Sequence, residues 1–486
     1  AIAVLPVILF HAGFDWFSGG YVGVDVFFVI SGYLITSILL REIRSGTFSL
    51  VHFYERRARR ILPALFLVCL ASLPFAWWLL PPQALTDFAQ SLIATATFWS
   101  NILFWLESDY FAATAELKPL LHTWSLAIEE QFYLFFPLIL LVLPKWQFSR
   151  INLLILLFAV ISYGLMLWGL PRYPEATFYL LPTRAWELMA GALLAVWHTR
   201  RIDANHTPIP TAPATNVLSL SGLLLIAIAV SLLDHDPPFP SHWTLLPVIG
   251  TALIIGFSQP GHWAHRLLRQ RPLVLIGLFS YSAYLWHQPM FAFAKIYYIS
   301  VPPPAVMVLL VMLSLLLAYL SWRYIEFPFR SRSRVSCQTV FICSGVASTA
   351  IIAIGLSGYL NQGFPILRST PQLIESLKTA RPSPMREQCH TQGNDYLKPK
   401  NSCTYGGDNI TWAVFGDSHA VEPAYALAQK LKLKNEGIKH YSFSLCGPNY
   451  GVSLDVPVGC GEWTQEVLAD LEQQPDIKNV LVAFRL

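Results

Sequence analysis

Charged residues are scarce in this 486-residue sequence. Asp, Glu, Lys and Arg make up 13% of it and hydrophobic residues 54%, whereas soluble domains carry about 25% charged residues. This composition excludes one large soluble core and predicts a polytopic membrane protein with a polar part attached. The net charge of +4 is small, and the arginines flank apolar segments, so nucleic acid is not an expected partner.

Cysteine is also sparse, and the seven residues include no CxxC pair and no Cys/His cluster, so no metal is expected. Four of them, Cys389, Cys403, Cys446 and Cys460, lie in the polar C-terminal part. An even set in one polar region predicts disulfides and an oxidising compartment, but the spacing leaves their connectivity open. No cleavable signal peptide is needed, because the first span would itself target the chain.

Long apolar runs are abundant, and a membrane-spanning helix needs about 20 such residues. Arg-rich loops mark the cytoplasmic side, and the loop 41–60 alone holds six Arg. Loop sides assigned from the N-terminal end and from the C-terminal end give the same topology only if the polar run 84–106 does not cross the membrane. We therefore interpret this run as a re-entrant or outer-surface helix. We therefore expect eleven spans, an inside N-terminus and an outside C-terminal region. The twelve candidate runs are 1–13, 21–40, 61–80, 84–106, 124–143, 151–170, 178–198, 216–233, 243–258, 272–296, 303–322 and 338–358.

The composition changes near residue 359. The segment 361–411 is rich in Pro, Lys, Asn and Gln and is interpreted as a linker or small extension, with disorder as the alternative. Residues 409–432 then predict a buried strand, a tight turn and a helix, and the strands GIKHYSFSL and NVLVAFRL follow. Strands that alternate with helices predict a parallel α/β layer.

The first forty residues place two ionisable groups, His11 and Asp25, inside apolar segments. Ionisable groups at membrane depth are costly and usually functional. His11 changes charge near neutral pH and can act as a general base; the alternative is a satisfied His near a helix end. Further along, FYERRARRILPAL suits either positive-inside topology or a site for phosphates. Its arginines are Arg56, Arg57, Arg59 and Arg60.

Other polar groups interrupt the later apolar runs. Glu129 and Glu130 begin one run, and only one of them is expected to face the bundle interior because helix neighbours point about 100° apart. His122 precedes them as a second polar participant or an interfacial His. Arg184 and Glu187 are three residues apart and can pair on one helix face. YSAYLWHQP with His287 and WRYIEFPFR with Glu326 add two groups without a derivable role.

Taken together, GGYVGVDVFFVISGYLIT after His11, the RxxR run and HTWSLAIEEQFY resemble the membrane-bound acyltransferase-3 family. Such proteins move acyl groups, usually acetyl, from a CoA thioester to extracytoplasmic sugars. The resemblance implies that His11 is the base and that Arg57 with Arg60, or Arg56 with Arg59, binds CoA. It also makes Glu129 the inward carboxylate. The family's first-helix Arg would fall one position before Ala1, so the N-terminus is expected to be clipped.

The sequence FGDSHA, with Gly416, Asp417 and Ser418, lies in a strand–turn–helix context. Backbone N–H groups at that helix N-terminus can stabilise an oxyanion. The motif resembles the SGNH domain fused to some acyltransferase-3 proteins, in which this Ser is the acyl-accepting nucleophile and a DxxH motif supplies its base. No DxxH follows Ser418. The domain is therefore expected to be clipped at its C-terminus and catalytically incomplete.

These observations predict four regions, and their bounds are 1–330 for the acyltransferase domain, 331–360 for a linking span, 361–411 for the extension and 412–486 for a partial SGNH domain. The expected protein is a bacterial inner-membrane O-acyltransferase that takes acetyl from acyl-CoA. Its expected acceptor is O-antigen of lipopolysaccharide, with peptidoglycan second. The alternative is a transporter of a lipid-linked sugar with an esterase domain, in which His11, Glu129 and Arg184 line a polar path.

Overall fold

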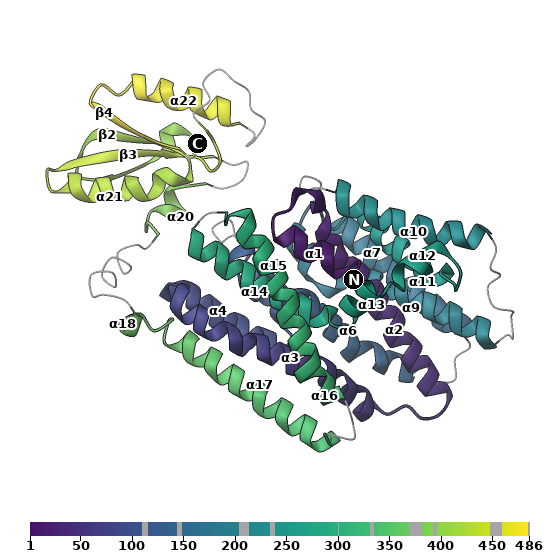
Figure 1. The fold of residues 1–486 in the computed structure, drawn as a ribbon. Coiled ribbons are helices and arrows are strands. Elements are labelled where there is room, and N and C mark those ends of the chain that lie inside the picture. The colour runs from purple at the N-terminus through teal and green to yellow at the C-terminus, as the bar shows by residue number, and fades with distance from the viewer. Residues whose placement is uncertain are drawn as a thin grey trace. The chain divides into compact units, whose positions relative to one another are not determined.

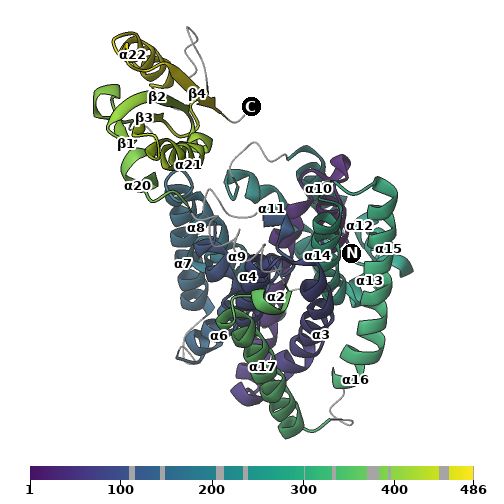
Figure 2. The same cartoon turned by 90° about the vertical axis from the view of Figure 1, so that its left-hand side faces the viewer.

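A computed structural model describes residues 1–108, 115–142, 148–203, 213–233, 239–299, 301–330, 335–368, 382–391, 396–447 and 459–484. The chain divides into two compact units, Ala1–Arg368 and Ser369–Leu486, which are called the membrane unit and the C-terminal unit. Figures 1 and 2 show that the first is helical and that the second contains a sheet.

The membrane unit is a bundle of helices. Its 3-10 and π-helical turns are η1 (Asp15–Phe17), η2 (Gly20–Val22), η3 (Ala115–Leu117), η4 (His242–Thr244) and η5 (Trp322–Glu326). Its α-helices are α1 (Val4–His11), α2 (Gly23–Arg44), α3 (Leu50–Leu79), α4 (Pro82–Ala96), α5 (Ser100–Leu106), α6 (Thr123–Val142), α7 (Phe148–Gly169), α8 (Pro174–Tyr179), α9 (Leu181–Asp203), α10 (Pro213–Leu232), α11 (Leu245–Phe257), α12 (Trp263–Leu268), α13 (Arg271–Leu278), α14 (Ser280–Tyr298), α15 (Pro304–Ser321), α16 (Phe327–Arg330), α17 (Cys337–Leu360) and α18 (Pro365–Arg368).

The chain is a multi-pass membrane protein. Within the described residues, seven helical stretches are long and apolar enough to cross a membrane, and the count of eleven spans stays a prediction. The other predicted runs fall short for local reasons: α1 and α11 are short, α9 contains an ion pair, and Phe279 separates α13 from α14. The seven stretches are Asp15–Arg44, Leu50–Leu79, Thr123–Leu141, Arg150–Gly169, Pro213–Leu232, Pro304–Arg330 and Cys337–Leu360.

The polar run 84–106 forms two short helices, α4 and α5, and is not among these stretches. The helical conformation is interrupted between them at Phe98, whose φ of 57° lies in the left-handed region. Helix α17 packs along α3 and α4, as Figure 1 shows. The expectation that 84–106 does not cross the membrane stays a prediction.

Helices α2 and α9 approach each other closely because glycines lie at their crossing. A Cβ atom on Gly32 would collide with the carbonyl oxygen of Leu188, and one on Gly191 with that of Val29. Small residues allow such close helix packing in membranes. The close crossing brings Asp25 of α2 beside Arg184 of α9.

The C-terminal unit has the α/β layer that the sequence predicts. Its sheet has the order β1–β3–β2–β4, in which β2 is parallel to β3 and β4, and β1 is antiparallel to β3. Alternate residues of β2 face opposite sides: Val414 packs with α21 residues, and Ala413 and Phe415 with α22 residues. The elements are α20 (Arg386–Cys389), η6 (Pro399–Asn401), β1 (Cys403–Gly406), β2 (Asn409–Gly416), η7 (Ser418–Ala420), α21 (Val421–Lys432), β3 (Glu436–Ser442), α22 (Cys460–Glu472) and β4 (Asn479–Ala483).

The sheet of the C-terminal unit begins before residue 412, inside the segment 361–411 that the sequence analysis interpreted as a linker or small extension. Residues Cys403–Gly406 form β1 of the sheet, and β2 already begins at Asn409. The predicted disulfides are present as Cys389–Cys403 and Cys446–Cys460. Composition could not show that β1 belongs to the sheet, because β1 is ordered by pairing with β3, about thirty positions later in the chain.

Candidate functional site

Three histidines from distant parts of the chain meet inside the membrane unit. His11 ends α1, His287 lies in α14, and His122 precedes α6. His11 Nδ1 lies 3.2 Å from His287 Nε2. The ring of His122 lies 5.6 Å from that of His287, and neither of its nitrogens has a hydrogen-bond partner among the described residues. The cluster contains two imidazoles for which the sequence offered no specific role.

A cavity of about 400 Å³ lies beside this cluster, which is within the size range of small-molecule sites. Its walls are largely aromatic. His11, His122 and Arg184 contribute polar atoms, and Gln288 and Glu116 lie at its edge. Because the polar groups are few and converge in an apolar space, the cavity has the character of a binding or catalytic site.

Arg184 belongs to a fully buried charge cluster. Its Nη2 lies 2.7 Å from Asp25 Oδ1, and its Nε lies 3.3 Å from Glu187 Oε1. The predicted Arg184–Glu187 pairing is therefore confirmed, with Asp25 as a second partner. The guanidinium also lies 5.4–5.8 Å from the ring centroids of four aromatic residues, a favourable cation–π distance. The cluster holds α2 against α9 and forms one wall of the cavity.

A second cavity, of about 120 Å³, is lined by Arg57, Arg60 and Glu129. Arg57 stacks 5.5 Å from the ring of Tyr133, and its Nε has no hydrogen-bond partner among the described residues. The Tyr133 hydroxyl lies 3.4 Å from Glu129 Oε2 and also contacts Ser31. Two guanidinium groups at one cavity suit an anionic ligand.

The other arginines of the RxxR run are structural. Arg56 pairs with Glu42 at 2.9 Å. Arg59 is buried, pairs with Glu55 at 2.7 Å and donates to the carbonyls of Phe329 and Val335. Of the two pairs that the sequence left open, Arg57 with Arg60 is the one that lines a cavity.

The remaining predicted membrane residues also divide into residues that line a cavity and residues that hold helices together. Glu129 lines the smaller cavity, whereas its neighbour Glu130 is not among the lining residues. Glu326 is buried, bonds to Ser282 and pairs with Arg330 at 2.7 Å. Glu326 therefore ties α14 to η5 and lines neither of the two cavities.

The two cavities share two lining residues, Val24 and Tyr284. The Tyr284 hydroxyl lies 2.7 Å from Ser125 Oγ and donates to the His122 carbonyl at 3.0 Å. Sequence reasoning did not select Tyr284 or Ser125. The only available signal was their place inside YSAYLWHQP and HTWSLAIEEQFY. The shared wall makes the arginine cavity and the histidine cavity neighbours.

In the C-terminal unit, the strand β2 ends at Gly416, where a Cβ atom would collide with the Ala483 carbonyl of β4. Asp417 then caps the turn, because its Oδ1 accepts from the His419 N–H at 2.8 Å. Ser418 follows at the start of η7, and its buried Oγ has no hydrogen-bond partner among the described residues. The turn presents a hydroxyl at a helix N-terminus beside the carboxyl end of the central strand, as ligand sites of α/β sheets require.

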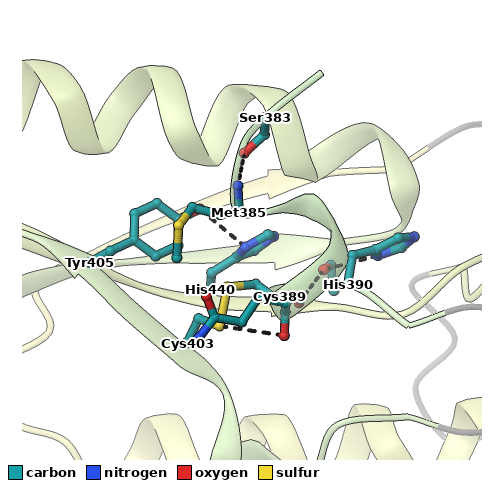
Figure 3. Close-up of a disulfide and its surroundings, with 9 residues drawn as sticks. Ser383, Met385, Cys389, His390, Cys403, Tyr405 and His440 are labelled. Carbon is teal, nitrogen blue, oxygen red and sulfur yellow. Dashed lines mark hydrogen bonds between the residues drawn. A yellow bond between two sulfur atoms is a disulfide. The ribbon is translucent and has the colours of Figure 1, made fainter. Parts of the chain in front are cut away.

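The segment before β1 adds polar groups to this region that the sequence did not suggest. Arg386 pairs with Glu422 at 2.6 Å and donates to the Ser418 carbonyl at 3.3 Å. His390 Nδ1 lies 3.1 Å from Ser442 Oγ. Figure 3 shows His390 and His440 near the Cys389–Cys403 disulfide. The disulfide therefore anchors a segment from which Arg386 reaches the Ser418 turn.

Acid is expected to destabilise the C-terminal unit between pH 6.5 and 4. Burial lowers the pKa of His390 to about 4, aided by Arg386, and burial likewise lowers the pKa of His440 to about 4. The unfolded chain then binds more protons than the folded unit across this window, so stability rises with pH there. Hydrogen-exchange protection of β3 amides, corrected for intrinsic rates, should fall about tenfold or more from pH 7 to 4.5.

The double variant His390→Gln/His440→Gln provides the control for this titration, because glutamine does not titrate in the same window. Its β3 protection should depend much less on pH. Equal or greater protection of the unaltered chain at pH 4.5 would contradict the assignment of neutral, buried imidazoles.

Comparisons with known proteins agree on both units. Residues 1–323 match the family described as an acyltransferase domain (Acyl_transf_3), and residues 388–486 match the SGNH domain that is fused to such domains. O-acetyltransferase OatA of Staphylococcus aureus is 35% identical over 68% of this chain and 56% of its own length. Peptidoglycan O-acetyltransferase OatA of Listeria monocytogenes is 34% identical over 74% of this chain and 62% of its own length. The chain thus spans little more than half of these relatives, and no solved structure matches it.

Proposed function

The chain belongs to the acyltransferase-3 family with a fused SGNH domain, and on this premise we propose that it is an O-acetyltransferase of peptidoglycan. The donor in this proposal is cytoplasmic acetyl-CoA. The observation that carries the proposal is the pair of neighbouring cavities, one lined by Arg57 and Arg60 and the other by His11, which share Tyr284. The protein belongs, in this proposal, in the bacterial inner membrane, with its C-terminal unit outside.

The donor end of the route is the cavity of Arg57, Arg60 and Glu129. Guanidinium groups bind phosphate oxygens well, and the run that supplies them lies in the Arg-rich loop predicted to be cytoplasmic. The smaller cavity has room for a narrow chain rather than for a nucleotide. The phosphates of CoA would therefore bind at its mouth, and the thioester arm would extend toward Tyr284.

In the proposed reaction, each bond that forms is matched by a bond that breaks, and no step changes an oxidation state. His11 takes the proton of the attacking hydroxyl as the acetyl carbonyl carbon forms its new C–O bond. The thioester C–S bond breaks, and CoA leaves as a thiol with the proton that His11 returns. In the C-terminal unit, the Ser418 hydroxyl attacks this first ester: its oxygen forms a new C–O bond to the acetyl carbon, the first ester's C–O bond breaks, and the Ser418 proton goes to the hydroxyl that leaves. A sugar hydroxyl attacks the Ser418 ester in the same way, and its proton goes to the Ser418 oxygen as the Ser418 ester bond breaks.

The acceptor is revised relative to the sequence analysis, which placed O-antigen first. The Listeria monocytogenes relative is named for peptidoglycan, and this name favours peptidoglycan as the acceptor here.

Ser418→Ala tests the proposal. Inside-out vesicles that hold the full-length protein and peptidoglycan precursors receive radiolabelled acetyl-CoA. Unaltered protein should label both the glycan and the peptide that contains Ser418. Ser418→Ala should lower glycan labelling about a thousandfold, because no hydroxyl remains to hold the acetyl group.

Ser402→Ala is the matched control, since Ser402 is a buried serine of the same unit away from the turn. It should label the glycan normally. Normal labelling by Ser418→Ala would refute the covalent relay. No consumption of acetyl-CoA together with undiminished export of a lipid-linked sugar would replace the proposal with transport.

A further inference from the structure

We infer that His287 is a positioning residue that holds the proton of His11 on Nδ1 and so keeps the lone pair on Nε2. The inference deepens the proposed function and rests on it, because it takes His11 as the base. It concerns an imidazole that the sequence left without a role. The hydrogen bonds of His287 to its own helix and to His11 carry the inference.

The first bond determines which nitrogen of His287 carries hydrogen. His287 Nδ1 lies 2.6 Å from the backbone carbonyl oxygen of Tyr284, one helical turn earlier. A carbonyl oxygen only accepts hydrogen bonds. The hydrogen of a neutral His287 is therefore on Nδ1, and its Nε2 is an acceptor.

The second bond determines which nitrogen of His11 carries hydrogen. His287 Nε2 lies 3.2 Å from His11 Nδ1. Because His287 Nε2 accepts, His11 Nδ1 must donate, and the unprotonated nitrogen of a neutral His11 is Nε2. When His11 takes a proton during the reaction, both of its nitrogens carry hydrogen and the same bond persists, now assisted by charge.

Burial supports a neutral His287. The residue is fully buried, and a charge there would need a partner of opposite sign. Its ring nitrogens lie within hydrogen-bond distance of the Tyr284 carbonyl and of His11, and no carboxylate of the described residues pairs with it. His122 packs its ring against His287 but forms no side-chain hydrogen bond to a described residue. His287 rather than His122 is thus the group that sets the tautomer.

Three substitutions separate this role from a merely structural one. His287→Gln can place an amide oxygen near the position of Nε2 and keep an acceptor for His11. His287→Asn can keep a donor for the Tyr284 carbonyl but is too short to reach His11. His287→Leu removes both bonds. The matched control is His262→Gln, because buried His262 also has its Nδ1 close to a backbone carbonyl, that of Phe257 at 3.1 Å, but lies outside both cavities.

The full-length protein is assayed with acetyl-CoA and a peptidoglycan acceptor, and kcat and KM are separated. His287→Leu and His287→Asn should lower kcat about tenfold to hundredfold, as loss of an orienting partner does elsewhere, with KM for acetyl-CoA unchanged. His287→Gln should recover most of kcat, and His262→Gln should match the unaltered protein. Nitrogen-15 NMR of labelled histidine should find His11 protonated on Nδ1 in the unaltered protein and on either nitrogen in His287→Leu.

Full activity of His287→Leu, or rescue by Asn but not by Gln, would overturn the inference. A His11 protonated on Nε2 in the unaltered protein would overturn it as well. These outcomes leave the proposed function intact as long as His11→Ala is inactive. If His11→Ala keeps normal activity, the proposed function itself fails, and the two failures are therefore distinguishable.

Discussion

His11→Ala is expected to lower acetyl transfer from acetyl-CoA about a thousandfold, within the range for loss of a general base. Alanine removes the imidazole that lines the histidine cavity and takes the proton in the proposed mechanism. The loss should appear in kcat, while acetyl-CoA binding at Arg57 and Arg60 continues. Release of CoA from labelled acetyl-CoA, measured at several donor concentrations, separates the two effects.

The control for this substitution is His52→Ala, since His52 is exposed at the start of α3 and lies outside both cavities. It should release CoA at the rate of the unaltered protein. Thermal unfolding in detergent establishes that His11→Ala is folded. Normal release of CoA and normal labelling of Ser418 by folded His11→Ala would show that His11 is structural and that the mechanism in the membrane unit is wrong.

Arg184→Met is expected to destabilise the membrane unit by about 3–5 kcal/mol, the cost of removing one member of a buried charge pair. The substitution leaves two carboxylates, Asp25 and Glu187, in a fully buried place without their cation. It also removes the cation that four aromatic rings surround. The unfolding temperature in detergent should fall by many degrees, and transfer activity should fall with it because α2 and α9 frame the cavity.

Arg172→Met is the matched control, because Arg172 is exposed, stacks on the Trp168 ring and donates to the Trp168 carbonyl at the surface. It should change the unfolding temperature little. The triple variant Arg184→Met/Asp25→Asn/Glu187→Gln removes all three charges and should recover most of the lost stability. An Arg184→Met protein that is as stable as the unaltered one would contradict a structural role for the cluster.

Features that depend on neighbouring residues in the chain were accessible from the sequence. Apolar runs and Arg-rich loops indicated a multi-pass membrane protein, because a bilayer imposes length and charge rules on each segment separately. The strand–turn–helix around Ser418 was equally local, since Gly416 and the cap at Asp417 belong to one short stretch. The Arg184–Glu187 pair followed from helical spacing alone.

Features that depend on distant residues required the tertiary structure. His11 and His287 are 276 positions apart, so no spacing rule relates them. The choice of Arg57 with Arg60 over Arg56 with Arg59 depends on which face of α3 meets the cavity and which meets Glu42 and Glu55. The disulfide connectivity and strand β1 likewise depend on pairing across the sheet.

The sequence by itself determined which chemical groups this protein carries and on which kind of element each one lies, because helix and strand periodicity, capping and membrane insertion act over a few residues. Only the tertiary structure decided which of these groups meet. A hydrogen bond or an ion pair forms within a few ångströms in space, and the packing of whole helices sets that distance. The His11–His287 pair and the cavity wall formed by Arg184 are therefore properties of the packed bundle.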